Sequence, residues 1–353
     1  MSLSCHVRMA AVAALLLCAP HIAVSQSTTP ADKKLPNPRL FRSEEVVNIT
    51  LSLNMRQIKR DKGDDAPWRD ATIRYKDAQG KEVVVPLRAR TRGVWRLQHC
   101  DYPPLRLKFG DKKADGTLFA NLDEPKLVTY CRNLDNYESY VLQEAQLYRI
   151  YRLLTDASFK IRVLRIAYAD SASGKVETTR YSFLIEDFKH LLARMGGKNL
   201  ERMGAIADDL SPRPTALAQT FLYFVANTDV SFNSLHNSEI VSMSNGDNIV
   251  VPYDFDMSGV INAVYATVDP KLPIKYVRTR IFRGFCEHLD AYPPVFDLFR
   301  AKRSAIEALY ADDIGKRMSP SVVKSTLKYY AEFYDDIATP ASVRKQLFAD
   351  CVK

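Results

Sequence analysis

The spacing of apolar residues differs between the two halves of the chain, and this difference constrains the fold more than any other feature. The clearest alternating run of the first half comprises Val47, Ile49, Leu51, Leu53 and Met55. Alternation with a period of two is typical of a half-buried β-strand. The second half instead carries helix-length apolar segments at 215–226, 295–310, 321–335 and 340–349. The pattern predicts an α+β fold, with a β-rich part at 43–187 followed by a mainly helical part at 188–353.

The first half contains further strand signals and one strong helix. The predicted strands after the first are 71–75, 83–90, 105–109, 126–130, 159–168 and 178–185. Between them, residues 137–154 carry Tyr137, Val141, Tyr148 and Tyr151 at helical spacing. This periodicity predicts a single long helix within the β-rich part.

The N-terminus has the pattern of a secretory signal peptide. Arg8 precedes an apolar run at 9–19, and small residues lead to a cleavage site after Ser25. The run is too short for a stable membrane span. We therefore predict a signal peptide at 1–25, a polar tether at 26–42, and a periplasmic or secreted protein without a transmembrane segment in the mature chain. A lipoprotein anchored through Cys18 is a weaker alternative, because the bulky Leu17 precedes that cysteine.

Four cysteines remain after the predicted cleavage: Cys100, Cys131, Cys286 and Cys351. An even number in an exported chain favours disulfides, and four cysteines allow three pairings. We expect Cys100–Cys131 and Cys286–Cys351, because each pair then stays within one predicted part of the fold. Buried free thiols are the alternative, while zinc is disfavoured because no two of the four have the spacing of a metal site.

The chain is basic, with 50 Lys and Arg against 41 Asp and Glu and a formal net charge of +9. Such an excess favours anionic partners such as a nucleotide, phosphate or an acidic surface. The export signal and the absence of a nucleic-acid motif argue against nucleic acid as a partner.

The stretch 227–259 concentrates acids and amides around a predicted hairpin. Asp229 follows an apolar helix, Asn237 lies in the next loop, and Asp254 and Asp256 follow the second strand of the hairpin. In phosphotransferases one carboxylate orients the acceptor hydroxyl, while an amide and a second carboxylate hold magnesium. We therefore predict a site here, with Asn233 as the alternative amide. Taken singly, each acid is also compatible with an ordinary turn.

Cations for such a site have two sources in the β-rich part. Glu144 lies in the middle of the apolar face of helix 137–154, where a carboxylate is costly unless a cation reaches it. We expect Arg106 or Lys108 to be that cation and to bind phosphates; the alternative is a Glu144 that reaches water. A stripe of Arg88, Arg90 and Arg92 could also meet phosphate oxygens, or else protect an exposed sheet edge.

Four segments together carry a family resemblance. "RTRGVWRLQHCDYPPLRLKF", "FLIED", "NTDVSFNSLHN" and "VVPYDFDMSG" resemble the spore-coat CotH-like kinase family, in its exported bacterial branch, over about residues 83–259. The resemblance implies a bilobal, atypical protein-kinase-like fold that transfers phosphoryl groups from ATP with Mg²⁺ or Mn²⁺.

The same resemblance assigns roles to individual residues. It makes Asp229 the catalytic acid, Asn237 the amide ligand and Asp254 the metal-binding acid, with Asp256 assisting and Glu186 at the nucleotide hinge. Where family members carry a lysine, this chain has Pro103 and Pro104, so the phosphate-binding cation is expected at Arg106 or Lys108.

Three functions are compatible with these features. The first is a phosphotransferase that acts on a protein or an envelope component. The second is a non-catalytic binding or assembly protein of the cell envelope. The third is a metal-dependent phosphoester hydrolase in which the same acids, with His236, activate water.

Overall fold

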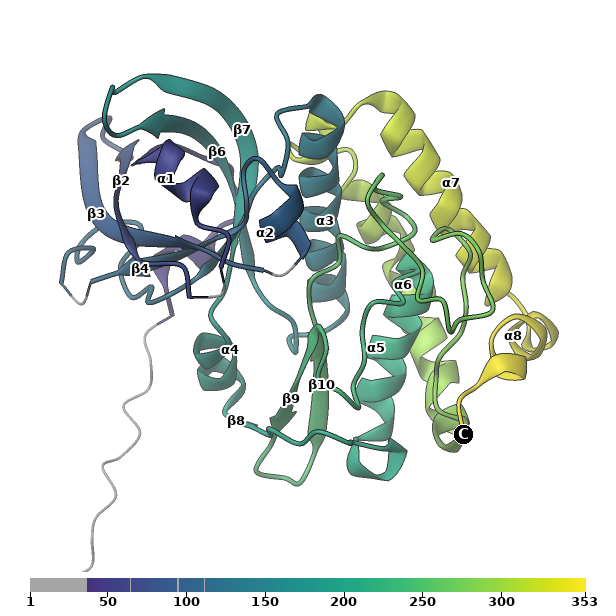
Figure 1. Ribbon diagram of the computed structural model, residues 1–353. Helices are drawn as coiled ribbons and strands as arrows, with labels where there is room; N and C mark the ends of the chain where they lie inside the picture. The colour runs from purple at the N-terminus through teal and green to yellow at the C-terminus, as the bar shows by residue number, and fades with distance from the viewer. Residues whose placement is uncertain (1–36, 64, 94, 111) are drawn as a thin grey trace, which may run out of the picture. The chain divides into compact units, whose positions relative to one another are not determined.

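Seven strands close into a barrel in the computed structural model, which describes residues 37–353 except 64, 94 and 111 (Figure 1). The strands are β1 (Val47–Leu53), β2 (Arg69–Lys76), β3 (Glu82–Thr91), β4 (Leu105–Phe109), β5 (Lys126–Val128), β6 (Ile161–Asp170) and β7 (Val176–Ile185). Their order around the barrel is β1-β2-β3-β4-β5-β7-β6. Neighbouring strands are antiparallel except β1 and β6, whose parallel pairing closes the barrel.

The alternating apolar residues fill the barrel. Leu51 pairs with Ile73, and Ile73 with Val85, and all three side chains are fully buried. The polar residues between them lie on the outer surface, because successive side chains of a strand point to opposite faces. The first strand ends at Leu53, since the side chain of Asn54 accepts a hydrogen bond from Gln57 N and caps a short helix.

Eight α-helices and a small second sheet complete the described part of the chain. The helices are α1 (Met55–Arg60), α2 (Trp95–His99), α3 (Asp135–Leu154), α4 (Phe188–Met195), α5 (Pro212–Val225), α6 (Tyr292–Ala308), α7 (Pro320–Asp336) and α8 (Pro340–Gln346). The second sheet has the order β10-β9-β8, from β8 (Lys198–Asn199), β9 (Ser238–Ser242) and β10 (Asn248–Pro252). Proline at the start of α5, α6, α7 and α8 favours helix initiation, because proline has no N–H to leave unpaired there.

Helix α3 connects the barrel to the helices that follow it, since it contacts β6 and β7 as well as α6 (Figure 1). Aromatic side chains continue this contact: Tyr148 lies 4.7 Å from Phe255, and Tyr151 lies 4.6 Å from Phe221, between ring centroids. One apolar core therefore runs from the barrel into the helical part, and the described chain from residue 37 onward belongs to one compact unit.

The predicted bilobal, protein-kinase-like fold is wrong. Its N-terminal lobe requires a β-rich sheet standing as a separate lobe, whereas here the sheet closes on itself through the β1–β6 pairing. The structure is a barrel-containing α+β fold. Strand positions follow from local alternation, but the partner of each strand depends on contacts between distant residues.

Both predicted disulfides are confirmed. Cys100 bonds Cys131 and Cys286 bonds Cys351, closing loops of 31 and 65 residues. Two disulfides fit an oxidising, extracytoplasmic compartment. The predicted signal peptide and most of the predicted tether lie outside the described residues. Within residues 37–353, no helix is long and apolar enough to cross a membrane.

Candidate functional site

The structure brings Asp229 and Asn237 into direct contact. Asn237 Nδ2 donates hydrogen bonds to the backbone oxygen of Asp229 at 2.9 Å and to Asp229 Oδ2 at 3.1 Å. Tyr253 N–H donates to the backbone oxygen of Asn237 at 2.9 Å. This bond brings the backbone of Asp254, the residue after Tyr253, close to Asn237. Asn233 instead donates to the backbone oxygen of Ala205, so Asn237 is the amide of this cluster.

His236 is the second partner of Asp229. Its Nε2 lies 3.2 Å from Asp229 Oδ1, and both side chains are partly exposed. Burial raises the pKa of Asp229. The contacts with His236 and Asn237 oppose this shift, and the negative charge of Asp254 adds to it. A carboxylate with a raised pKa, held by two polar partners, suits a group that accepts a proton.

The backbone around this cluster is unusual. Ala226, Leu235, Asn237 and Asp254 all have positive φ, at 51°, 51°, 52° and 61°. This conformation is uncommon for residues other than glycine and costs about 1–3 kcal/mol at each position. The Asp254 N–H donates to the Tyr148 hydroxyl at 2.8 Å. Such outliers concentrate at functional sites, where surrounding contacts hold the backbone in place.

Two cationic side chains, Lys126 and Arg92, border the acids, and only Arg92 was predicted from the sequence. Lys126, at the start of β5, has its Nζ 4.3 Å from the centre of the Tyr253 ring. Burial lowers the pKa of Lys126 to about 8; nearby Arg92 contributes, and Asp254 opposes the shift. Burial likewise lowers the pKa of Arg92, again opposed by Asp254. The sequence marks Lys126 only as the first residue of a strand, so nothing local distinguishes it from lysines that lie on the surface.

Only Arg92 of the predicted arginine stripe belongs to this group. Arg88 donates to the backbone oxygen of Trp68, and the Arg90 guanidinium lies 4.6 Å from the centre of the Trp68 ring. Strand β3 pairs with β2 on one side and β4 on the other. Protection of an exposed sheet edge is therefore not the explanation for the stripe.

Glu144 does have a cation, but it is not the predicted one. Its Oε2 lies 3.6 Å from Nη2 of Arg96, which α2 contributes, and its side chain is 1% exposed. Arg106 and Lys108 pair with Glu124 instead, at 3.7 and 2.7 Å. Both alternate with the buried Leu105, Leu107 and Phe109 and so lie on the outer surface of β4. Arg106 nevertheless stands opposite Lys126 in the β4–β5 pairing, at the border of the cationic group.

Asp256 is engaged by the same arginine. Arg96 Nε and Nη2 donate to Asp256 Oδ2 at 3.0 and 2.6 Å. Burial raises the pKa of both Glu144 and Asp256, and Arg96 opposes the shift in each case. Two buried carboxylates thus share one guanidinium, which engages Asp256 through Oδ2.

Glu186 does not join the cluster. Its carboxylate accepts hydrogen bonds from Arg194 Nε at 3.1 Å and from Lys160 N–H at 3.1 Å, and its side chain is 1% exposed. These contacts hold α4 against the start of β6. The predicted place of Glu186 at a nucleotide hinge stays a prediction.

The acids and the amide of this cluster fit a divalent cation only if water and substrate supply its other ligands. The described part of the chain has no cluster of three or more His, Cys, Asp or Glu side chains that could hold a metal ion. Asp229 and Asp254 with the amide of Asn237 provide two carboxylates and one carbonyl. Magnesium is commonly held by one or two carboxylates, with water and substrate phosphates as its other ligands. These residues are compatible with that arrangement, but not with a cage made by protein alone.

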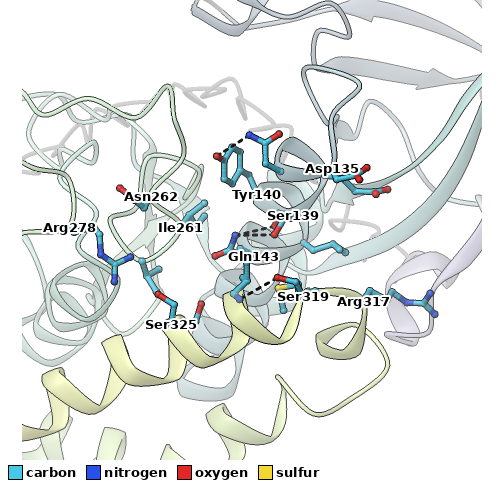
Figure 2. Close-up of a pocket in the computed structure, with 17 residues that line it drawn as sticks. Asp135, Ser139, Tyr140, Gln143, Ile261, Asn262, Arg278, Arg317, Ser319 and Ser325 are labelled. Atoms are coloured by element: carbon cyan, nitrogen blue, oxygen red, sulfur yellow. Dashed lines mark hydrogen bonds between the residues drawn. The ribbon is translucent and has the colours of Figure 1, made fainter.

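A cavity that is separate from this cluster lies between α3 and α7 (Figure 2). It has a volume of about 700 Å³, and its lining mixes hydroxyl, amide and charged side chains such as Ser325, Gln143 and Arg278. None of the predicted site residues, all of which are among the described residues, lines it. Its arginines have partners: Arg317 pairs with Asp313, and Arg278 lies over the Tyr329 ring. The cavity is therefore distinct from the acidic cluster.

Comparison with family models, curated proteins and solved structures finds no significant match to this chain. The resemblance to the CotH-like family stays a prediction.

Proposed function

We propose that this protein is a phosphotransferase, which uses ATP with Mg²⁺ or Mn²⁺ to phosphorylate a hydroxyl group on a protein or another component of the cell envelope. The observation that carries the proposal is the meeting of opposite charges at one place. Asp229 and Asp254 come from the helical part of the chain, where Tyr253 N–H donates to the backbone oxygen of Asn237, the partner of Asp229. Lys126 comes from β5 of the barrel, with its Nζ 4.3 Å from the ring centre of Tyr253, and Arg92 directly follows β3. Phosphoryl transfer depends mainly on positioning and on electrostatic stabilisation, which this arrangement offers.

Each side chain has a role that follows from its surroundings. Lys126 and Arg92 bind phosphate oxygens, for which their positive charges are suited. Asp229 accepts a hydrogen bond from the acceptor hydroxyl and takes its proton. Its raised pKa brings it closer to neutral pH, where a general base is most effective. Asn237 and His236 fix the orientation of the Asp229 carboxylate.

A divalent cation would be held by Asp254 and the Asn237 carbonyl oxygen. When bound, it would neutralise negative charge on the phosphates. Asp256 and Glu144 position Arg96 and support the loop that carries Asp254, rather than contacting a ligand.

A phosphoester hydrolase is the second candidate, and the Asp229–His236 contact favours it. An imidazole 3.2 Å from a carboxylate can orient a water molecule and accept its proton. The two activities share the phosphate-binding cations and differ in the acceptor, which is water for the hydrolase.

The test uses the purified, disulfide-bonded protein with ATP and Mg²⁺ or Mn²⁺. Thermal stabilisation measures nucleotide binding, and mass spectrometry of envelope proteins or of the chain itself measures transfer. We expect stabilisation by millimolar ATP, and transfer that is lost in Asp229→Asn and Lys126→Met. The matched control is Asp208→Asn, since Asp208 is an exposed acid outside the cluster.

Three outcomes would change the proposal. Absence of stabilisation by ATP with either metal would overturn it. Release of inorganic phosphate from a simple phosphoester, lost in His236→Gln, would identify the hydrolase. Binding of ATP without turnover, unchanged in Asp229→Asn, would indicate a non-catalytic binding protein.

A further inference from the structure

A small cavity lies directly behind the loop that carries Asp229. Its volume is about 180 Å³, below the range of pockets for drug-sized ligands. Its walls are largely apolar, with Leu222, Val230, Phe232, Phe285 and Val352 among the lining side chains. An isolated β-bridge pairs Val352 with Phe285 and holds Val352 here, next to the Cys286–Cys351 disulfide.

One buried polar group in this cavity lacks a partner. Asn227 lines the cavity and is 4% exposed. Its Oδ1 accepts a hydrogen bond from the Asp229 N–H at 2.8 Å, which fixes the orientation of the amide. Its Nδ2 has no hydrogen-bond partner within the described residues. A buried donor left unpaired costs about 1–3 kcal/mol, so this position favours a ligand with an acceptor oxygen.

The other polar side chains that line the cavity are those of Gln219, Tyr223, Ser231, Asn233 and Arg283. The first four have hydrogen-bond partners within the described chain. Gln219 Oε1 accepts from the Tyr292 hydroxyl at 2.5 Å, and Gln219 Nε2 donates to the Arg283 backbone oxygen at 3.3 Å. The exposed Arg283 side chain uses Nη1 to bind the Thr228 backbone oxygen at 3.0 Å. Within the described chain it has no carboxylate partner at ion-pair distance. The cavity therefore combines apolar walls, one buried amide donor and one free positive charge.

We propose that this cavity binds a small carboxylic acid with a compact apolar body. The carboxylate accepts hydrogen bonds from Asn227 Nδ2 and from the Arg283 guanidinium, which is a charge-assisted pairing. The apolar body packs against Val230, Phe232 and Phe285. A neutral ligand would leave the arginine charge unpaired, and acetate would leave the apolar walls uncovered.

The ligand would contact the segment that positions Asp229. Asn227 holds the Asp229 N–H, and Arg283 holds the carbonyl of Thr228. Occupancy therefore stabilises the loop between α5 and β9. Binding of the carboxylic acid requires only these contacts and is independent of phosphotransfer.

The test is calorimetric titration of the full, disulfide-bonded protein with benzoate and isovalerate, compared with benzamide and acetate. We expect saturable binding of at least one of the two apolar carboxylates. Benzamide and acetate should bind at least about tenfold more weakly, which corresponds to about 1.4 kcal/mol. Arg283→Gln should weaken carboxylate binding by a similar factor. Arg213→Gln is the matched control, because Arg213 is an exposed arginine of α5 that does not line the cavity.

A second variant tests the apolar part of the site. Val230→Phe fills the cavity and should abolish binding. If it does not fold, Val352→Trp serves the same purpose at the rim, where Val352 is 41% exposed. The proposal is overturned if neither carboxylate saturates the protein, or if binding survives both Arg283→Gln and the folded cavity-filling variant. Because the measurement is binding without ATP, failure here leaves the proposed catalytic function untouched.

Discussion

Arg96 and Asp256 are joined by two hydrogen bonds although 160 residues separate them in the sequence. The guanidinium of Arg96 donates to Asp256 Oδ2 from both Nε and Nη2, and the Glu144 carboxylate lies 3.6 Å from the same Nη2. This contact ties α2, α3 and the loop after β10 together. It therefore sets the position of Asp254, two residues before Asp256.

Replacement of Arg96 should destabilise the fold severely. Arg96→Met leaves Glu144 and Asp256 buried without a cation, and breaking a buried ion pair in this way costs about 3–5 kcal/mol. Urea unfolding monitored by fluorescence measures the change in the free energy of unfolding. The control is Arg303→Met, whose pair with Glu307 is exposed and contributes less than about 1 kcal/mol. Equal losses in the two variants would contradict the structural role of Arg96.

Glu144→Gln should change how stability depends on pH. Burial raises the pKa of Glu144 in the folded chain, so the folded state keeps a proton that the unfolded state releases above its pKa of about 4.3. The contribution of Glu144 to the free energy of unfolding is therefore present at low pH and is lost as pH rises. Glutamine does not titrate, so the variant should gain thermal stability relative to the parent at pH 8 and not at pH 4.

The melting temperatures of Glu144→Gln and its parent, measured between pH 4 and pH 8, check this. Glu287→Gln is the control, since Glu287 is exposed, and it should follow the parent at every pH. A constant difference between Glu144→Gln and the parent across the range would show that the pKa of Glu144 is the same in the folded and unfolded states.

Lys126 should make phosphate binding depend on pH near 8. Its pKa is lowered to about 8, so the side chain loses its positive charge as pH rises through that value. Affinity for ATP, or for inorganic phosphate as a simpler probe, should fall between pH 7 and 9. Lys126→Arg should retain binding at pH 9, because arginine stays protonated, and Lys126→Met should bind weakly at both values.

Isothermal titration at pH 7 and 9 measures this effect. Lys324→Met is the matched control, because Lys324 is an exposed lysine on α7. If the parent and Lys126→Met show the same pH dependence, the phosphate contact is made elsewhere.

The Cys286–Cys351 disulfide should contribute strongly to stability. It closes a loop of 65 residues, for which the chain-entropy model gives about 4 kcal/mol. The double variant Cys286→Ser, Cys351→Ser should therefore unfold at a markedly lower urea concentration. The parent measured with dithiothreitol loses both disulfides, so its urea midpoint should lie at or below that of this variant. The double variant Cys100→Ser, Cys131→Ser measures the contribution of the other bond. An unchanged urea midpoint would show that the C-terminal segment is held by packing alone.

Local patterns of the sequence predicted much of the secondary structure. Alternation located β1, strand signals located β2 and β3, and helical spacing located α3. Apolar segments of helix length located α5, α6, α7 and α8. The contact between Asp229 and Asn237 was also predictable, because only one short loop separates the two residues. These features depend on neighbours within a few residues, whose effects can be read from the chain.

Closure of the barrel was decided by tertiary structure, and it overturned the predicted kinase-like lobe. The parallel pairing of β1 with β6 joins strands more than 100 residues apart along the chain, such as Val47 with Leu164. Alternation shows which face of a strand is buried, but it carries no information about which strand lies beside it.

Only the tertiary structure identified the cations of the site. The sequence marked Glu144 as a buried acid in need of a partner and Asp229 and Asp254 as acids in suggestive loops. It did not show that Arg96 is that partner, or that Lys126 borders Asp254. A charge on a side chain is a local property, whereas burial and pairing with an opposite charge depend on how distant segments pack.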